Sequence, residues 1–166
     1  PSVQEKTNSL LKKTLRKFNI TKPYLLYVGN AYPHKNLERL ILAFNQLNDP
    51  RYQLVLVGEM DYFYRRLKKF AESLPLKTRQ AIIFTGFVTD EDLKIIFQGA
   101  SLYVFPSLCE GFGLPPLEAL AFCRPVVSSW AASLPEILKQ AAVYFNPEKV
   151  DEITAKIKYV LENPLI

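Results

Sequence analysis

Residues 102–122 read LYVFPSLCEGFGLPPLEALAF, and this stretch joins a strand pattern to a helix pattern through a loop that contains glycine. The four apolar and aromatic residues Leu102 to Phe105 predict a buried strand, which ends at Pro106. The prolines that follow the loop suit the first turn of a helix, and the apolar spacing predicts this helix at Leu117 to Phe122. A strand, a loop and a helix in this order form the repeating unit of α/β proteins.

The same strand and helix unit recurs on both sides of this stretch. Apolar and aromatic runs predict further strands at Tyr24 to Val28, Gln53 to Val57, Ile82 to Phe84 and Pro125 to Ser128. Apolar residues at three- and four-residue spacing predict helices at Leu10 to Phe18, Leu37 to Leu47, Tyr62 to Ser73, Asp90 to Gln98 and Val150 to Leu161. Together they predict an α/β fold, a Rossmann-like doubly wound parallel sheet with helices on both faces.

The length and composition favour one ordinary domain over residues 1–166, with a leading helix or linker at 1–22 and a Rossmann-like core at 23–162. Hydrophobic residues make up 49% of the chain, which is enough for a core without disulfides or metal, and disordered and fibrous classes are excluded. Because the chain begins with Pro1 rather than Met, we expect it to be a piece of a longer protein.

Charge and cysteine content limit where the protein acts and what it binds. Cys109 and Cys123 have no His or Cys at metal-ligand spacing, so we expect reduced thiols in the cytoplasm. No apolar run approaches the roughly 20 residues of a membrane helix, so any membrane association would be peripheral. The net charge of +5 fits a phosphate-bearing ligand, an anionic membrane or nucleic acid, although a solvated helix at residues 12–17 explains much of it. Because no nucleic-acid motif is present, we expect no nucleic acid partner.

The loop at Glu110-Gly111-Phe112-Gly113 is the strongest candidate site, since ligands of doubly wound sheets bind where loops leave the carboxyl ends of the strands. The glycines allow backbone N–H groups at the start of the helix to face an anion, such as a diphosphate. Carboxylates beside a phosphate are repelled, so Glu110 and Glu118 are expected to accept hydrogen bonds from neutral hydroxyls of a sugar or ribose. In the alternative interpretation Glu110 caps the turn and Glu118 lies on the surface.

Asp90, Glu91 and Asp92 have the letters of a D-x-D metal motif. They follow Thr89, a predicted N-cap, and acidic residues are expected in the first turn of a helix. We therefore expect no bound metal and no other cofactor.

Two further segments carry polar residues near predicted strand ends. Ser133 and Glu136 predict a capping box for a helix that begins at Leu134. Arg65 and Arg66 could add positive charge to the site, but adjacent residues point to different faces of a helix, and a solvated helix is the other interpretation.

The segment from Gly86 to Glu118 resembles the carboxyl-terminal domain of glycosyltransferase family 4, whose signature is a glutamate, seven residues and a second glutamate. The resemblance extends over residues 23–160. It implies the GT-B fold, in which two Rossmann-like domains face a cleft, and retaining transfer of a sugar from a nucleotide donor. It also implies that Glu110 binds the donor hexose near its 3- and 4-hydroxyls, and that Glu118 accepts hydrogen bonds from the ribose.

The resemblance assigns backbone contacts with the sugar and the diphosphate to the stretch between the two glutamates. These donor-binding residues are Gly111, Phe112, Gly113 and Leu114. Phe87 and Val88 correspond to the base-binding segment of the family, which contacts the nucleobase through backbone and apolar groups.

The loop that begins at Gly29 resembles the phosphate-binding loop of the family, in which an arginine and a later lysine hold the diphosphate. Lys35 corresponds to the lysine and would offset the charge of the leaving group. Asn30 occupies the place of the arginine, as in a subset of the family with a short polar residue there. His34 precedes the lysine and could reach the phosphates; the alternative is a loop histidine without a role.

These correspondences predict the donor-binding half of a retaining hexosyltransferase of polysaccharide biosynthesis, with Glu110 and Lys35 as its catalytic residues. GDP-mannose is favoured because the first loop is similar to that of mannosyl- and rhamnosyltransferase-like members, and a UDP-sugar is the other donor considered. The acceptor would be held by an amino-terminal GT-B domain that this chain does not contain, so the isolated chain is expected to be inactive. The alternative is a non-catalytic nucleotide-sugar-binding module.

Overall fold

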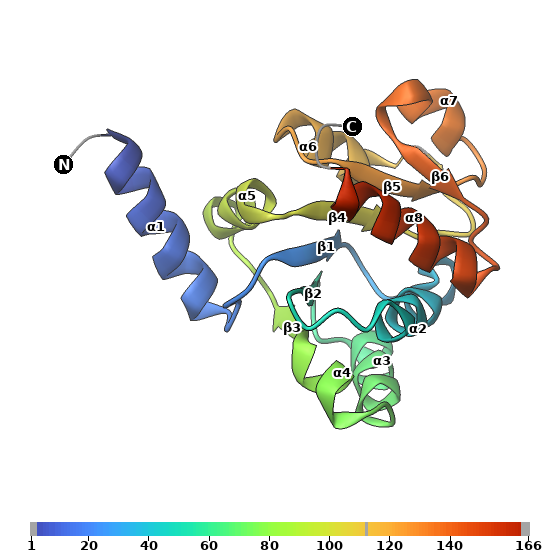
Figure 1. The fold of residues 1–166 in the computed structure, drawn as a ribbon, viewed down its shortest axis with the longest axis horizontal. Coiled ribbons are helices and arrows are strands. Elements are labelled where there is room, and N and C mark those ends of the chain that lie inside the picture. The colour runs from blue at the N-terminus through green and yellow to red at the C-terminus, as the bar shows by residue number, and fades with distance from the viewer. Residues whose placement is uncertain (1–2, 112, 164–166) are drawn as a thin grey trace.

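The structure, a computed structural model, describes residues 3–111 and 113–163. Its six strands form one sheet in the order β3-β2-β1-β4-β5-β6, and all five neighbouring pairs are parallel (Figure 1). The strands are β1 (Tyr24–Val28), β2 (Gln53–Val57), β3 (Ile82–Gly86), β4 (Leu102–Phe105), β5 (Val126–Ser129) and β6 (Val143–Phe145). Since this is the strand order of a doubly wound Rossmann sheet, the predicted fold class is confirmed.

Helices connect the strands and precede or follow the sheet. They are α1 (Val3–Lys17), α2 (Leu37–Leu47), α3 (Tyr62–Glu72), α4 (Leu76–Ala81), α5 (Asp90–Gly99), α6 (Leu114–Ala121), α7 (Leu134–Leu138) and α8 (Val150–Glu162), with 3₁₀ turns η1 (Pro33–Lys35) and η2 (Lys139–Ala141). Helix α2 packs against both α3 and α8, and α5 packs against α1. The last helix of the chain therefore covers the same side of the sheet as the first crossover helix (Figure 1).

Strands β1, β2 and β4 are buried on both faces, which is why nearly all of their positions are apolar or aromatic. Residues 24–27 of β1 and 54–57 of β2 are all buried, with no alternation between core and solvent. A parallel sheet covered by helices on both faces produces this pattern. Three strands, β1, β2 and β4, match their predicted bounds residue for residue, because each run is followed directly by a glycine or a proline, namely Gly29, Gly58 and Pro106.

The structure differs most from the predicted elements at four places. Helix α1 begins at Val3, seven residues before the predicted start at Leu10, because residues 3–9 are mostly polar and show no apolar periodicity. Helix α4 and strand β6 were not predicted, because runs of six and three residues are too short to show a clear periodicity. Helix α6 begins at Leu114, three residues before the predicted start, because both prolines at its first turn are compatible with helical backbone. The extra strand β6 completes the sixth position of the sheet.

Candidate functional site

The site lies at the carboxyl ends of β1 and β4, where the order of the strands reverses. Strand β1 is paired with β2 on one side and with β4 on the other, so the loop after β1 and the loop after β4 leave the sheet side by side. Such a reversal is where doubly wound sheets bind their ligands. The ion pair described below joins these two loops.

The loop after β1 starts with Gly29, whose backbone has a φ of 147°. A side chain at this position would strain the backbone, and its Cβ would lie 2.8 Å from the hydroxyl of Tyr27. The amide of Gly29 donates to the carbonyl of Val57 at 3.0 Å, which continues the β1–β2 pairing by one residue. The loop then turns away from the sheet and forms η1, which ends at Lys35.

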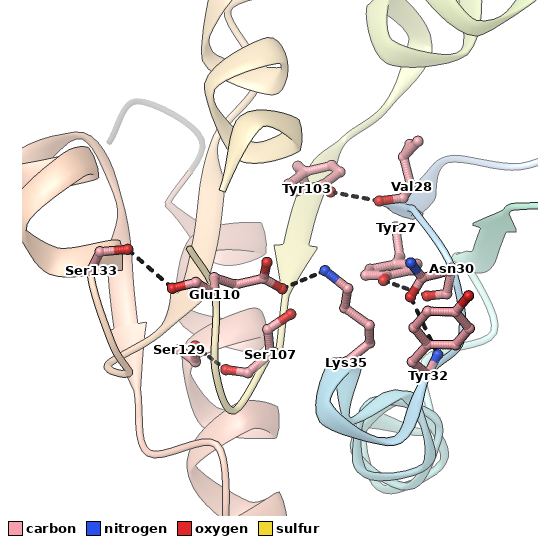
Figure 2. Close-up of polar contacts among 10 residues, drawn as sticks. All are labelled: Tyr27, Val28, Asn30, Tyr32, Lys35, Tyr103, Ser107, Glu110, Ser129 and Ser133. Atoms are coloured by element: carbon pink, nitrogen blue, oxygen red, sulfur yellow. Dashed lines mark hydrogen bonds and ion pairs between the residues drawn. The ribbon is translucent and has the colours of Figure 1, made fainter. Parts of the chain in front are cut away.

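Three buried tyrosines hold the beginning of this loop. The hydroxyls of Tyr103, Tyr64 and Tyr27 donate to the carbonyls of residues 28, 29 and 30 at 3.3, 2.9 and 2.8 Å (the first and last are drawn in Figure 2). Burial raises the pKa of all three hydroxyls above the ordinary value of a tyrosine, so they remain protonated donors at neutral pH. These three hydrogen bonds therefore fix the backbone of residues 28–30. Asn30 is the residue at the place of the family's arginine.

Lys35 and Glu110 form an ion pair across the two loops. The Nζ atom of Lys35 lies 2.6 Å from Oε1 of Glu110, although the two residues are 75 positions apart in the chain (Figure 2). Their side chains are only 14% and 10% exposed, and the ammonium also lies 5.6 Å from the ring centroid of Phe105. Since little water reaches the pair, the interaction is stronger than a surface ion pair. The structure thus brings together the two residues predicted to be catalytic.

Asn36, which follows Lys35 in the chain, connects three loops through its side chain. Its backbone is left-handed, with a φ of 61°, and its side chain is buried. The side-chain amide donates to the carbonyls of Pro106 and Pro147 at 3.0 and 2.8 Å, so it joins the loops after β1, β4 and β6. A further bond between the same loops runs from the amide of Leu108 to the carbonyl of His34 at 2.8 Å.

His34 contributes its backbone to the site, but its imidazole is exposed. The ring lies 6.0 Å from the ring of Tyr32, in a tilted arrangement. Asn30 is exposed as well, and its side-chain oxygen accepts a long hydrogen bond of 3.4 Å from the amide of Tyr32. Both side chains are therefore accessible to solvent, and their roles in donor binding stay predictions.

The loop after β4 leads into α6 through Gly113, which has a φ of 71°. A Cβ at this position would lie 2.7 Å from Leu134 in α7, so glycine allows both the backbone turn and the close approach of that helix. The first three positions of α6 are Leu114, Pro115 and Pro116, and the two prolines have no N–H group. The anion site predicted at the start of this helix is therefore limited to the amides that precede them. Phe112 lies outside the described residues.

Ser133 holds the same loop from the outside, and here the sequence prediction was wrong. Helix α7 begins at Leu134 as expected, but the Ser133 side chain makes no capping hydrogen bond. Its hydroxyl donates instead to the carbonyl of Gly111 at 2.8 Å, with the carbonyl of Glu110 at 3.4 Å (the latter contact is drawn in Figure 2). A carbonyl of the neighbouring loop competes successfully with the helix amide, because local sequence does not show which loop lies nearby.

A pocket of about 320 Å³ lies at the carboxyl ends of β1, β2 and β3, beside the loop that carries Lys35. Its lining includes four predicted donor-binding residues, which are Gly29, Asn30, Phe87 and Val88. The ring of Phe87 is 79% exposed, an unusual position for a large apolar side chain without a partner. Glu59, exposed in the loop after β2, lines the same pocket and was not among the predicted site residues.

Glu118 stands apart from the ion pair. It is exposed on the second turn of α6, whereas Glu110 lies in the loop before that helix. Burial raises the pKa of Tyr103 well above its ordinary value, and the negative charges of Glu118 and Glu110 raise it further.

The remaining candidate residues have structural contacts. Thr89 caps α5 as predicted, since its hydroxyl accepts from the amide of Asp92 at 3.3 Å, and the Asp92 carboxylate pairs with Lys17 of α1. Arg65 donates to the carbonyl of Met60, and Arg66 lies 4.0 Å from Glu38. Among the described residues no group of three His, Cys, Asp or Glu side chains is placed to hold a metal ion.

Sequence reasoning missed Asn36 and the three tyrosines as contributors to the site. The tyrosines read as ordinary core residues, because a hydroxyl aimed at a loop carbonyl leaves no trace in the apolar pattern. Asn36 did carry a signal, since asparagine directly before a helix favours left-handed backbone and local side-chain hydrogen bonds.

Comparison with known proteins adds a family match and close sequence relatives. A model described as Glycosyl transferases group 1 matches residues 12–165. The chain is 39% identical over 141 residues to the serotype-specific mannosyltransferase WbdA of Escherichia coli, a match that covers 82% of this chain and 17% of that protein. It is 38% identical over 144 residues to O-antigen chain mannosyltransferase B of Escherichia coli, covering 84% of this chain and 37% of that protein.

Solved structures agree with this assignment. The structure of sucrose-phosphate synthase from Thermosynechococcus elongatus superposes with a TM-score of 0.79 at 27% identity, over 92% of this chain and 40% of that one. The chain thus spans well under half the length of these relatives. Within residues 3–111 and 113–163, none of the helices has the length and apolar character that crossing a membrane needs.

Proposed function

The chain belongs to the family of glycosyl transferases group 1, and from this membership and the geometry at β1 and β4 we propose that it binds the nucleotide-sugar donor of a retaining mannosyltransferase. Lys35 and Glu110 are the observation that carries the proposal. A cation and a carboxylate held together at the topological switch point offer one group for a diphosphate and one for sugar hydroxyls.

In the proposed complex the two members of the ion pair take separate partners. The ammonium of Lys35 turns to the diphosphate, and Glu110 accepts hydrogen bonds from hydroxyls of the hexose. During transfer the bond between the anomeric carbon and the diphosphate oxygen breaks, and its electron pair leaves with the diphosphate. A new bond forms to the acceptor oxygen, and the acceptor proton passes to the departing diphosphate. Lys35 stabilises the charge that develops on that leaving group.

The pocket beside Gly29 is the proposed nucleobase site. Phe87 offers an exposed ring for stacking, and Val88 lies at the same edge. Glu59 supports guanine in particular, because a carboxylate only accepts hydrogen bonds and guanine presents two adjacent N–H donor groups. Uracil presents a single N–H group between two carbonyl oxygens, and these two oxygens would be repelled by a carboxylate. Together with the mannosyltransferase relatives, this favours GDP-mannose as the donor.

We further propose that a second, amino-terminal GT-B domain of the same enzyme closes over this site and supplies the acceptor. The relatives are much longer than the region that matches, which leaves room for such a domain in them. The enzyme would work in the cytoplasm, and its membrane contact, if any, would be peripheral. On its own, the chain is expected to bind donor without transferring its sugar.

Isothermal titration calorimetry with GDP-mannose, GDP, UDP-glucose and UDP tests the proposal. We expect binding of the guanine nucleotides, tighter than that of their uridine counterparts, and we expect Glu59→Gln to reduce that preference by about tenfold. The proposal fails if a folded sample binds none of the four ligands at millimolar concentration. Preference for the uridine ligands would retain a donor site and overturn the assignment of the base.

A further inference from the structure

Ser107 lies at the bottom of the proposed site with an unused hydroxyl. The residue follows β4, directly after Pro106, and its relative exposure is 0%. Its Oγ is the one buried side-chain nitrogen or oxygen, among the described residues, that has no hydrogen-bond partner. The backbone is fixed all the same, because its carbonyl accepts a hydrogen bond of 2.6 Å from the hydroxyl of Ser129 in β5.

A buried hydroxyl without a partner is costly for a protein. It loses its hydrogen bonds to water on folding and gains none in return, whereas alanine would fill the same position without that penalty. Every other buried side-chain polar atom of the described residues is satisfied. The exception lies at the site, and a partner gained when the site is filled would remove this penalty.

The surroundings of Ser107 identify that partner. In Figure 2 its hydroxyl points toward the ion pair of Lys35 and Glu110. In the proposed complex Lys35 turns to the diphosphate, and Glu110 then loses the cation that neutralises it. A hydroxyl that can reach a carboxylate is a suitable replacement donor, since hydrogen bonds to charged acceptors are strong.

We propose that Ser107 is a positioning residue of the donor site, whose hydroxyl donates to the Glu110 carboxylate once the donor has drawn Lys35 away. The inference rests on the proposed function and extends it. Glu110 must be oriented to accept hydrogen bonds from sugar hydroxyls while Lys35 binds the diphosphate. The hydrogen bond from Ser129 fixes the backbone of Ser107, and from there the Ser107 hydroxyl would orient the Glu110 carboxylate. In the free protein the hydroxyl makes no hydrogen bond, so the proposal requires the Glu110 side chain to shift toward Ser107 when Lys35 leaves it.

Two variants separate this role from a purely structural one. Ser107→Ala removes the hydroxyl, and Ser128→Ala is the matched control, because Ser128 is equally buried in β5 and its hydroxyl makes only a long contact of 3.4 Å with the next carbonyl. We expect the Tm of Ser107→Ala to equal or exceed that of the wild type. Its Kd for GDP-mannose should rise about tenfold, while its Kd for GDP, which has no sugar for Glu110, should change less than about twofold.

A double-mutant cycle with Glu110→Ala tests whether Ser107 acts through that carboxylate. If it does, removing the Ser107 hydroxyl from the Glu110→Ala protein changes the Kd for GDP-mannose less than about twofold. A full tenfold effect in that background would overturn the inference, as would a lowered Tm or equal losses for GDP and GDP-mannose. Wild-type protein that binds neither ligand would overturn the proposed function, and this role with it, whereas normal binding by Ser107→Ala would overturn this role alone.

Discussion

The partly buried ion pair makes each of its members depend on the other. Removing the cation alone, as in Lys35→Met, leaves the Glu110 carboxylate about nine-tenths covered and without its partner. We expect the free energy of unfolding to fall by about 1–3 kcal/mol, measured by urea denaturation. The double variant Lys35→Met with Glu110→Gln has no uncompensated charge and should recover most of the loss. If the double variant is as unstable as the sum of the two single ones, the pair does not interact as the structure indicates.

The two glutamates are expected to read different parts of the donor. Glu110 pairs with the lysine and faces the sugar in the proposed complex, whereas Glu118 lies exposed on α6 and is assigned to the ribose. Glu118→Ala should therefore weaken GDP and GDP-mannose alike, by about tenfold each in calorimetry. Glu110→Ala should weaken GDP-mannose more than GDP. If Glu110→Ala also weakens GDP and GDP-mannose by the same factor, the two carboxylates do not contact different parts of the donor.

At the scale of elements, the start of α6 depends on one glycine of the two in its loop. Gly113 has a φ of 71° and no room for a Cβ beside Leu134, whereas a Cβ on Gly111 would meet nothing within 4 Å. Gly113→Ala should lower the free energy of unfolding by about 1–3 kcal/mol and weaken donor binding, because α6 and α7 must move apart.

Gly111→Ala is the matched control for this prediction. Its stability should stay within about 0.5 kcal/mol of the wild type, since the added methyl group lies in open space. The two variants and the wild type are compared by thermal and urea unfolding under the same conditions. Equal stability of the two variants would contradict the packing described between the loop and α7.

The sequence predicted the strands well and the contacts between loops poorly. The strands β1, β2 and β4 are continuous apolar runs whose ends are visible in the chain itself. The pairing of Lys35 with Glu110 arises from the adjacency of β1 and β4, which depends on the order of strands in the folded sheet. Ser133 shows the same limit, because its hydroxyl binds a loop carbonyl 22 residues away instead of its own helix.

At the scale of the whole molecule, the loops of the site form one connected support. Asn36 joins three of them, the hydroxyls of the three tyrosines hold the loop after β1, and Ser133 holds the loop before α6. A ligand that contacts several of these loops at once would be stabilised by an arrangement that already exists in the free protein. This agrees with a domain that binds a donor through its own fold and leaves the acceptor to a second domain.

The crystal structure of the chain with GDP-mannose would test the central claim most directly, through the distance between Lys35 Nζ and Glu110 Oε1. That distance is 2.6 Å in the free protein. We predict that the pair is broken in the complex, with the ammonium on the diphosphate, Glu110 on the mannose hydroxyls and the guanine in the pocket beside Phe87. A nucleotide bound elsewhere on the chain, or bound at this site with Lys35 and Glu110 still paired, would contradict the account.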